Sequence, residues 1–284
     1  MKQIQIRNLS HTDNTTLLNC FNISFSDYVI PFRLNLPQLE TKLRTESVDK
    51  SISIGAFRGD QLIGFVLHGQ RRIDDVQVAY NGGTGVIPEE RGQKITRKMY
   101  EFILPILKQR GFEEVVLEVI STNTPAISSY DKIGFKEIRH LSCFKGKPLV
   151  RETNRHIRIE EVKAVHFDEV LQFGEIEPTW QNSKATILEL GNAVRYFLAF
   201  NGDAIYGYCF LNNANHRILQ IAVKKELRNG LIGSSLLHAI GHAIRGPISI
   251  INVDDGFRST LDFFEKRDMK KTLGQLEMRL KIRY

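Results

Sequence analysis

The chain has 284 residues, of which 42% are hydrophobic and 25% are charged. This composition is typical of a globular protein and excludes a disordered or fibrous one, and the length suggests two domains of ordinary size. The formal net charge of +7 favours anionic partners, but the charges are spread out and form no long basic block, so it is weak support for nucleic-acid binding.

Cysteine usage and hydropathy indicate an intracellular setting. The three cysteines, Cys20, Cys143 and Cys209, are widely spaced and form no CxxC motif, which fits a reducing cytosol better than a disulfide scaffold. The opening segment, MKQIQIRNLS, lacks the apolar stretch of a secretory signal. No apolar run approaches the roughly 20 residues needed to span a bilayer. We therefore expect a soluble, cytoplasmic protein without a membrane partner.

The C-terminal tail is basic, but its charges are interrupted by apolar residues at strand spacing. The basic residues are Lys266, Arg267, Lys270, Lys271, Arg279, Lys281 and Arg283. We therefore expect the solvated face of a strand here and no nucleic-acid partner.

An internal repeat organises the predicted elements. Residues 56–65 read AFRGDQLIGF and residues 199–208 read AFNGDAIYGY. Each has an alternating apolar strand, a Gly-Asp turn and a second strand, which predicts a β-hairpin because Gly and Asp tolerate the left-handed backbone of a tight turn.

The elements after the two hairpins follow the same order, β, α, β, α, β. In the first half we predict a strand over 78–87, a helix over about 92–110, a strand over 115–120 and a helix over about 125–133. In the second half we predict a strand over 217–223, a helix over about 229–245, a strand over 248–253 and a helix over about 258–267. The pattern predicts two α/β domains, 1–150 and 151–284.

Two stretches of the first half carry chemistry. The first is TGVIPEERGQKIT, residues 84–96, in which a strand runs through a short loop into a helix. A helix N-terminus has unpaired N–H groups and a partial positive charge, so it can hold a phosphate. A plain strand-to-helix turn is an equally simple interpretation.

The second stretch is LEVISTNTPAISSYDKIGF, residues 117–135. It places Glu118 on a strand, Asn123 in a turn before a helix, and Ala126 and Tyr130 on one face of that helix. Gly134 and Phe135 then end the helix and begin the last strand.

The two stretches together resemble the GCN5-related N-acetyltransferase (GNAT) family. The order strand, PxxRGQ, helix, then LEVxxxNxxAxxxYxxxGF is especially similar to members that acetylate the N-terminal alanine of a ribosomal protein. The resemblance covers residues 1–147 well and 156–284 in outline. It implies two GNAT folds in tandem, each a twisted mixed sheet with helices on both faces, and acetyl-CoA as co-substrate, without a metal.

The resemblance also implies roles for individual residues. The backbone of Thr84, Gly85 and Val86 would contact the pantetheine arm. Asn123 would touch the cofactor nearby, with Ala126 in the same site, and Tyr130 would stand beside the sulfur. The pyrophosphate would be wrapped by Arg91, Gly92, Gln93, Lys94, Ile95 and Thr96.

Two positions of the phosphate loop depart from the family. Lys94 and Thr96 stand where the family has glycine. The Lys94 side chain either crowds the phosphate or points outward and adds a charge. We expect binding to be retained, because backbone amides do most of the holding.

The chemistry of amide formation suggests the catalytic roles. An alkyl amine has a pKa near ~10.4 and arrives protonated, so a base must take its proton. Glu118 is our candidate; the alternative is a surface strand glutamate paired with a lysine. The Val86 N–H would stabilise the oxyanion, and Tyr130 would protonate the leaving thiolate, unless it is a core tyrosine with a satisfied hydroxyl. Because no cysteine lies in these motifs, we expect direct transfer in a ternary complex.

The second half carries a degraded version of both motifs. In LRNGLIGSS, residues 227–235, Leu231 stands where a glycine is usual. Phe264 takes the place of Tyr130, and Phe257 that of Asn123. Phenylalanine cannot donate a proton, so we predict no turnover here and a role in substrate recognition, as a lid, or as an interface.

Several alternatives stay open at this point. The acceptor is a small-molecule or peptide amine: a protein N-terminus, a polyamine, an aminoglycoside or an amino sugar. The oligomeric state is open. A non-catalytic acyl-CoA-binding or scaffold module is the alternative to an enzyme. His238 and His242 lie four residues apart on a helix but lack the HExxH pattern, so we expect no metal site.

Overall fold

The computed structural model describes residues 3–28 and 32–282 and shows a mixed α/β fold built as two compact units. The first unit combines Met1–Val119, Asn123–Ile138 and Glu277–Tyr284, and the second combines Ile120–Thr122 and Arg139–Leu276. Arg283 of the basic tail lies outside the described residues. Among residues 3–28 and 32–282, no helix is both long and apolar enough to span a membrane.

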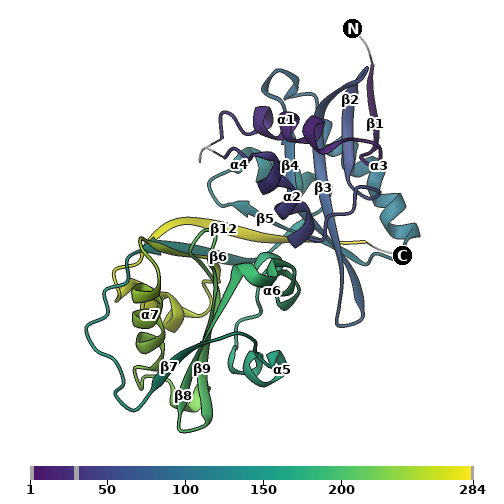
Figure 1. The fold of residues 1–284 in the computed structure, drawn as a ribbon. Helices are drawn as coiled ribbons and strands as arrows, with labels where there is room; N and C mark the ends of the chain where they lie inside the picture. Colours follow the sequence, from purple (N-terminus) through teal and green to yellow (C-terminus); the bar gives the residue numbers. More distant parts are fainter. Residues whose placement is uncertain (1–2, 29–31, 283–284) are drawn as a thin grey trace. The chain divides into compact units, whose positions relative to one another are not determined.

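The two units are not the uninterrupted halves 1–150 and 151–284. Strand β6 (Lys136–Gly146) pairs antiparallel with β11 (Ile248–Asp254) of the second repeat, and most of it therefore belongs to the second unit. In exchange, the last residues of β12 (Lys270–Lys281) belong to the first unit, where the Ile282 N–H donates to the Glu113 carbonyl at 2.7 Å. The end of the chain, yellow in Figure 1, thus completes the domain that its beginning starts.

In the first unit the strand order is β1-β2-β3-β4-β5, followed by the end of β12. The first four strands pair antiparallel, and β4 and β5 pair parallel. The predicted hairpin is confirmed, with Gly59 at φ 62° in its turn. The bounds are β1 Ile4–Asn8, β2 Ile54–Arg58, β3 Gln61–Ile73, β4 Val76–Val86 and β5 Glu114–Ile120.

Helices cover both faces of this sheet (Figure 1). Neighbouring residues of β3 point to opposite faces: the Phe65 ring stacks on Phe21 of α1 at 5.6 Å, and the His68 ring meets Tyr100 of α3 edge-on at 5.8 Å. Helices α1 and α3 therefore lie on opposite faces. The bounds are α1 Asn14–Ser24, α2 Leu36–Thr45, α3 Ile95–Gln109 and α4 Thr124–Ile133, with a 3-10 turn at Pro88–Glu90.

Helix α3 begins at Ile95 rather than near Gly92 as predicted. Gly92 and Lys94 both have left-handed backbones, with φ of 79° and 56°, and a right-handed helix cannot extend back through them. The helix then continues through Pro105.

The second unit repeats this plan. Its strand order is the first part of β12, then β6-β11-β10-β9-β8-β7, with β10 and β11 parallel. One buried cluster packs around α7 and another around α5 and α6. The remaining strands are β7 Arg158–Val162, β8 Val194–Asn201, β9 Ala204–Asn212 and β10 Arg217–Val223. The helices are α5 Phe167–Val170, α6 Lys184–Leu190, α7 Ile232–Ala243 and α8 Arg258–Glu265, with 3-10 turns at Leu171–Phe173, Trp180–Asn182, Gly191–Ala193 and Lys225–Leu227.

Candidate active site

An opening in the sheet of the first unit marks the candidate site. The parallel strands β4 and β5 pair only from Val78 with Glu114 to Tyr80 with Val116, although both strands run on beyond that point. Opposite β3, β4 carries one extra residue, Gly82, between the partners of Leu67 and His68, which is a β-bulge. The bulge bends β4, and the carboxyl ends of two parallel strands therefore come apart where α/β folds usually bind ligands.

On the α1 and α2 face of this opening, Glu118 accepts a hydrogen bond from the Tyr80 hydroxyl at 2.6 Å. Burial raises the pKa of Tyr80 well above its ordinary value, and the carboxylates of Glu118 and Glu46 add to the shift. Tyr80 therefore stays protonated and donates. The Glu118 side chain is half-buried.

On the α3 and α4 face, Tyr130 belongs to a polar cluster centred on Asn81. The Asn81 Nδ2 lies 3.4 Å from the Tyr130 hydroxyl, 2.9 Å from the Tyr100 hydroxyl and 2.8 Å from Thr84 Oγ1. Burial raises the pKa of Tyr130, while hydrogen bonds from Thr84 and Asn81 act against the rise. The phenol is thus neutral at physiological pH and can give up a proton.

Asn123 and Ala126 shape the start of α4. Asn123 is the N-cap: its Oδ1 accepts from the Ala126 N–H at 3.3 Å, and its Nδ2 donates to the Tyr28 hydroxyl at 3.2 Å. The cap occupies the Ala126 N–H, so Ala126 offers a ligand only its small side chain.

The loop before α3 is held in place by Arg91. Its guanidinium forms a double ion pair with Asp27, at 2.6 and 2.8 Å, and also donates to the Ser24 and Val86 carbonyls. The Arg91 side chain is therefore engaged with the protein, and what the loop offers a phosphate is its backbone. The first-turn N–H groups of α3 have no partner within the helix.

The other residues predicted to bind the cofactor differ in their surroundings. Ile95 is buried in the core, and the Gln93 side chain donates to Glu90. Gly85 is required sterically, because a Cβ there would lie 2.7 Å from both Phe65 and Ser24. Val86, like Thr84 and Gly85, lies on β4 beyond its last pairing with β5.

Lys94 gives the loop a testable feature. Its side chain is exposed and its backbone is left-handed, which costs a residue with a Cβ about 1 kcal/mol. We expect Lys94→Gly to raise the melting temperature slightly and to change the affinity for acetyl-CoA less than threefold, measured by calorimetry. Leu231→Gly, at φ 60° in the second unit, is the matched control. A tenfold loss of affinity in Lys94→Gly alone would show that the lysine charge holds the phosphate.

Two residues of the site were not predicted from the sequence. Tyr80 contacts Glu118, and Asn81 contacts Tyr130, yet both lie in a strand that reads VAYNGGTGV. The Asn-Gly-Gly inside this strand was the available signal, because such residues mark bulges and close backbone approaches.

The second unit reproduces the backbone of the site without its polar groups. Phe257 begins α8 at φ −100° and ψ 69°, close to Asn123 before α4 at −84° and 68°. The Met269 N–H donates to the Phe264 carbonyl, as the Phe135 N–H does to that of Tyr130. The predicted equivalence of the motifs therefore holds in the backbone.

The fold of the two units, and the opening between β4 and β5, can be compared with those of known proteins. The chain superposes on a tandem GNAT protein from the clavulanic acid biosynthesis pathway with a TM-score of 0.72, over 99% of both chains at 10% identity, which shows a tandem GNAT fold. Residues 17–135, nearly all of them in the first unit, match the model of the acetyltransferase (GNAT) family.

Two curated relatives align with parts of the chain. One is a mycothiol acetyltransferase of Catenulispora acidiphila, 37% identical over 83 residues, or 28% of this chain and 26% of the relative. The other is N-alpha-acetyltransferase 30 of Schizosaccharomyces pombe, 38% identical over 56 residues, or 20% of this chain and 37% of the relative. Each alignment spans less than half of the relative.

Proposed function

We propose that the protein transfers an acetyl group from acetyl-CoA to a primary amine at the opening between β4 and β5. The observation that carries this proposal is the placement of Glu118 and Tyr130. Glu118 borders the opening from β5 on one face of the sheet, and Tyr130 contacts β4 from the other face. A base and an acid thus approach one gap from its two sides, as amide formation from a thioester requires.

The residues present fit acetyl-CoA as the acyl donor. The unpaired edge of β4 from Thr84 to Val86 offers backbone groups to an extended pantetheine arm, and the loop at 91–96 offers N–H groups to a pyrophosphate. The bound thioester supplies the activated acetyl group.

The chain's own groups would then handle the protons and charge. Glu118 takes a proton from the acceptor ammonium, directly or through a water, so that the amine can attack. The Val86 N–H stabilises the oxyanion, and the Tyr130 hydroxyl protonates the thiolate. A cysteine relay is disfavoured because Cys20, Cys143 and Cys209 are all buried, and burial raises the pKa of the Cys20 thiol to about 12.

The relatives support acetyl transfer, and their names point to two different classes of acceptor. N-alpha-acetyltransferase 30 is named for transfer to an α-amine, and mycothiol acetyltransferase is named for a small molecule. We propose an α-amine of a peptide or a small-molecule primary amine, and we propose that the second unit does not catalyse.

A non-catalytic acyl-CoA-binding module is the second candidate, favoured by the lysine and threonine at positions 94 and 96. Calorimetric titration with acetyl-CoA, followed by thiol release with a panel of primary amines and N-terminal peptides, separates the two. Binding with amine-dependent thiol release supports the enzyme. Binding without release for any amine supports the module, and no binding at millimolar acetyl-CoA contradicts both.

Tyr80 gives the proposed mechanism a pH signature. Tyr80→Phe removes the donor that favours the ionised form of Glu118. We expect the acid limb of the pH profile of kcat/KM to move to higher pH, with a loss of about tenfold below it and little change at high pH. Steady-state kinetics between pH 5 and about 9 measure this. A uniform loss at every pH would mean that Tyr80 serves only packing.

A further inference from the structure

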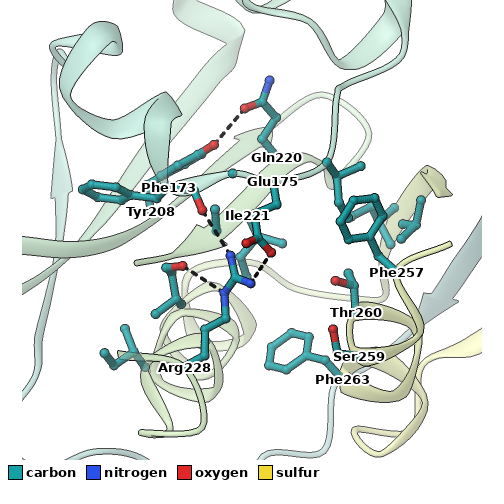
Figure 2. Close-up of a pocket in the computed structure, with 18 of the residues that line it drawn as sticks. Phe173, Glu175, Tyr208, Gln220, Ile221, Arg228, Phe257, Ser259, Thr260 and Phe263 are labelled. Atoms are coloured by element: carbon teal, nitrogen blue, oxygen red, sulfur yellow. Dashed lines mark hydrogen bonds and ion pairs between the residues drawn. The ribbon is translucent and has the colours of Figure 1, made fainter. Parts of the chain in front are cut away.

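A cavity of about 510 Å³ lies within the second unit (Figure 2). It opens where β10 and β11 come apart, since these parallel strands pair only at Arg217 with Ser249 and Ile218 with Ile250. The start of α7 and one side of α8 form other walls. A volume in this range suits a small organic ligand.

Phenyl groups line the cavity where the first unit has polar or small side chains. Phe257 stands where the first unit has Asn123, and Phe263, counted in the same register, stands where it has Ser129. The Phe263 ring covers the first turn of α7 so closely that a Cβ on Gly233 would lie 2.9 Å from it. The helix start that would receive a phosphate is thus covered by an aromatic ring.

Three of the five charged residues that line the cavity, Glu175, Arg228 and Asp262, form ion pairs within the unit. Arg228 forms an ion pair with Glu175 at 2.5 Å. Hydrogen bonds from Arg228, and to a smaller extent from Lys225, lower the pKa of Glu175 to about 2, so both members of the ion pair are charged at neutral pH. Asp262 pairs with Arg258 at 2.7 Å. Arg267 stacks on the Phe263 ring at 3.9 Å and donates to Ser234. Lys266 is exposed at the rim.

One wall of the cavity is polar but uncharged, and it contains a hydrogen-bond acceptor that has no donor. The Tyr208 hydroxyl donates to Gln220 Oε1 at 3.0 Å, Gln220 Nε2 donates to the Asn182 carbonyl at 2.7 Å, and Asn182 Nδ2 donates to the Ile251 carbonyl at 2.9 Å (Figure 2 shows the first of these bonds). Asn182 is 4% exposed, and its Oδ1 is buried without a hydrogen-bond partner among the described residues. A buried acceptor of this kind is normally satisfied by a donor.

We propose that this cavity binds a small, uncharged compound with a flat apolar body and one N–H or O–H donor, held between Phe257 and Phe263 with its donor on Asn182. Aromatic walls favour a flat ring through offset or edge-on contacts. An unsatisfied acceptor favours a donor and disfavours a carboxylate or phosphate. The second unit is thus a ligand-binding domain whose ligand differs from the acyl donor of the first, and the inference stands whether or not the first unit catalyses.

Indole and N-methylindole test the proposal as a matched pair, because they share a ring and differ in the N–H donor. Calorimetry and ligand-observed NMR on the full chain should show one indole site and binding of N-methylindole weaker by about tenfold. Asn182→Leu should bring the two affinities within twofold of each other. Ser259→Trp, at an exposed position on the cavity wall, should abolish binding of both, whereas Leu188→Trp, exposed on α6 and outside the cavity, should not.

Three results would overturn the proposal. They are no indole binding at millimolar concentration, equal affinity for the two probes in the wild-type chain, or displacement of indole by coenzyme A, which would make the cavity a nucleotide site. Circular dichroism and melting curves of each variant show whether it is folded, and the ratio of the two probe affinities in the wild-type chain needs no variant.

Discussion

Glu118→Gln is expected to lower kcat/KM for an amine acceptor by about 10² to 10⁴-fold at neutral pH. The amide keeps the shape of the carboxylate and can still accept from Tyr80, but it cannot take a proton from the acceptor. The affinity for acetyl-CoA should be unchanged, because the pyrophosphate is expected at the loop 91–96 and Glu118 is not part of that loop. Thiol-release kinetics and calorimetry measure the two effects separately.

The pH profile makes the result specific for a lost base. The Glu118→Gln rate should recover as the pH rises and the free amine becomes the major form of the acceptor. Glu114→Gln is the matched control, since Glu114 lies on the same strand and pairs with Arg279 at 3.4 Å. A variant that keeps more than a tenth of the wild-type rate would contradict the role of Glu118, or would show that the second unit turns over substrate.

Tyr130→Phe is expected to lower kcat by about 10²-fold with little change in the affinity for acetyl-CoA. The ring still packs edge-on against Tyr100 and Phe135, at 6.5 and 5.5 Å, so the fold should be kept. Only the hydroxyl that we propose as the proton donor for the leaving thiolate is lost. A less basic thiolate needs this proton less. Acyl donors with more acidic thiols should therefore reduce the difference in kcat between Tyr130→Phe and the wild-type protein.

Tyr100→Phe is the control for this second variant. Tyr100 is also buried and also accepts from Asn81, at 2.9 Å, but it lies on α3 rather than on α4. Its loss should cost stability without a comparable fall in kcat. Equal falls in the two variants would assign both hydroxyls to the integrity of the Asn81 cluster and none to proton transfer.

Much of the fold follows from local patterns that survive in the final structure. The hairpin turns at Gly59 and Gly202, the strand over 217–223 and helix α4 with its Asn123 cap all depend on residues within a few positions of one another. Side-chain periodicity and turn chemistry are local, so the sequence carries them directly.

The rest depended on contacts that local patterns do not encode. The left-handed Lys94 moves the start of α3, although lysine gives no warning of it. The pairing of β6 with β11, and the assignment of residues 277–282 to the first unit, join segments more than a hundred residues apart. Tyr80 reaches Glu118 because it pairs with Val116, two residues before Glu118 on β5, and this pairing joins segments more than thirty residues apart. Sequence spacing places residues on an element but does not say which distant element receives them.

The exchanged ends of the sheet have a consequence for synthesis. The first unit needs residues 277–282, which the ribosome makes last, and translation at 5–20 residues per second leaves roughly 10 to 30 s between its fifth strand and this final one. During that interval the nascent unit exposes the bare edge of β5, the kind of edge on which chains aggregate. A first repeat made without residues 277–282 would lack this final strand, so we expect its β5 edge to stay exposed.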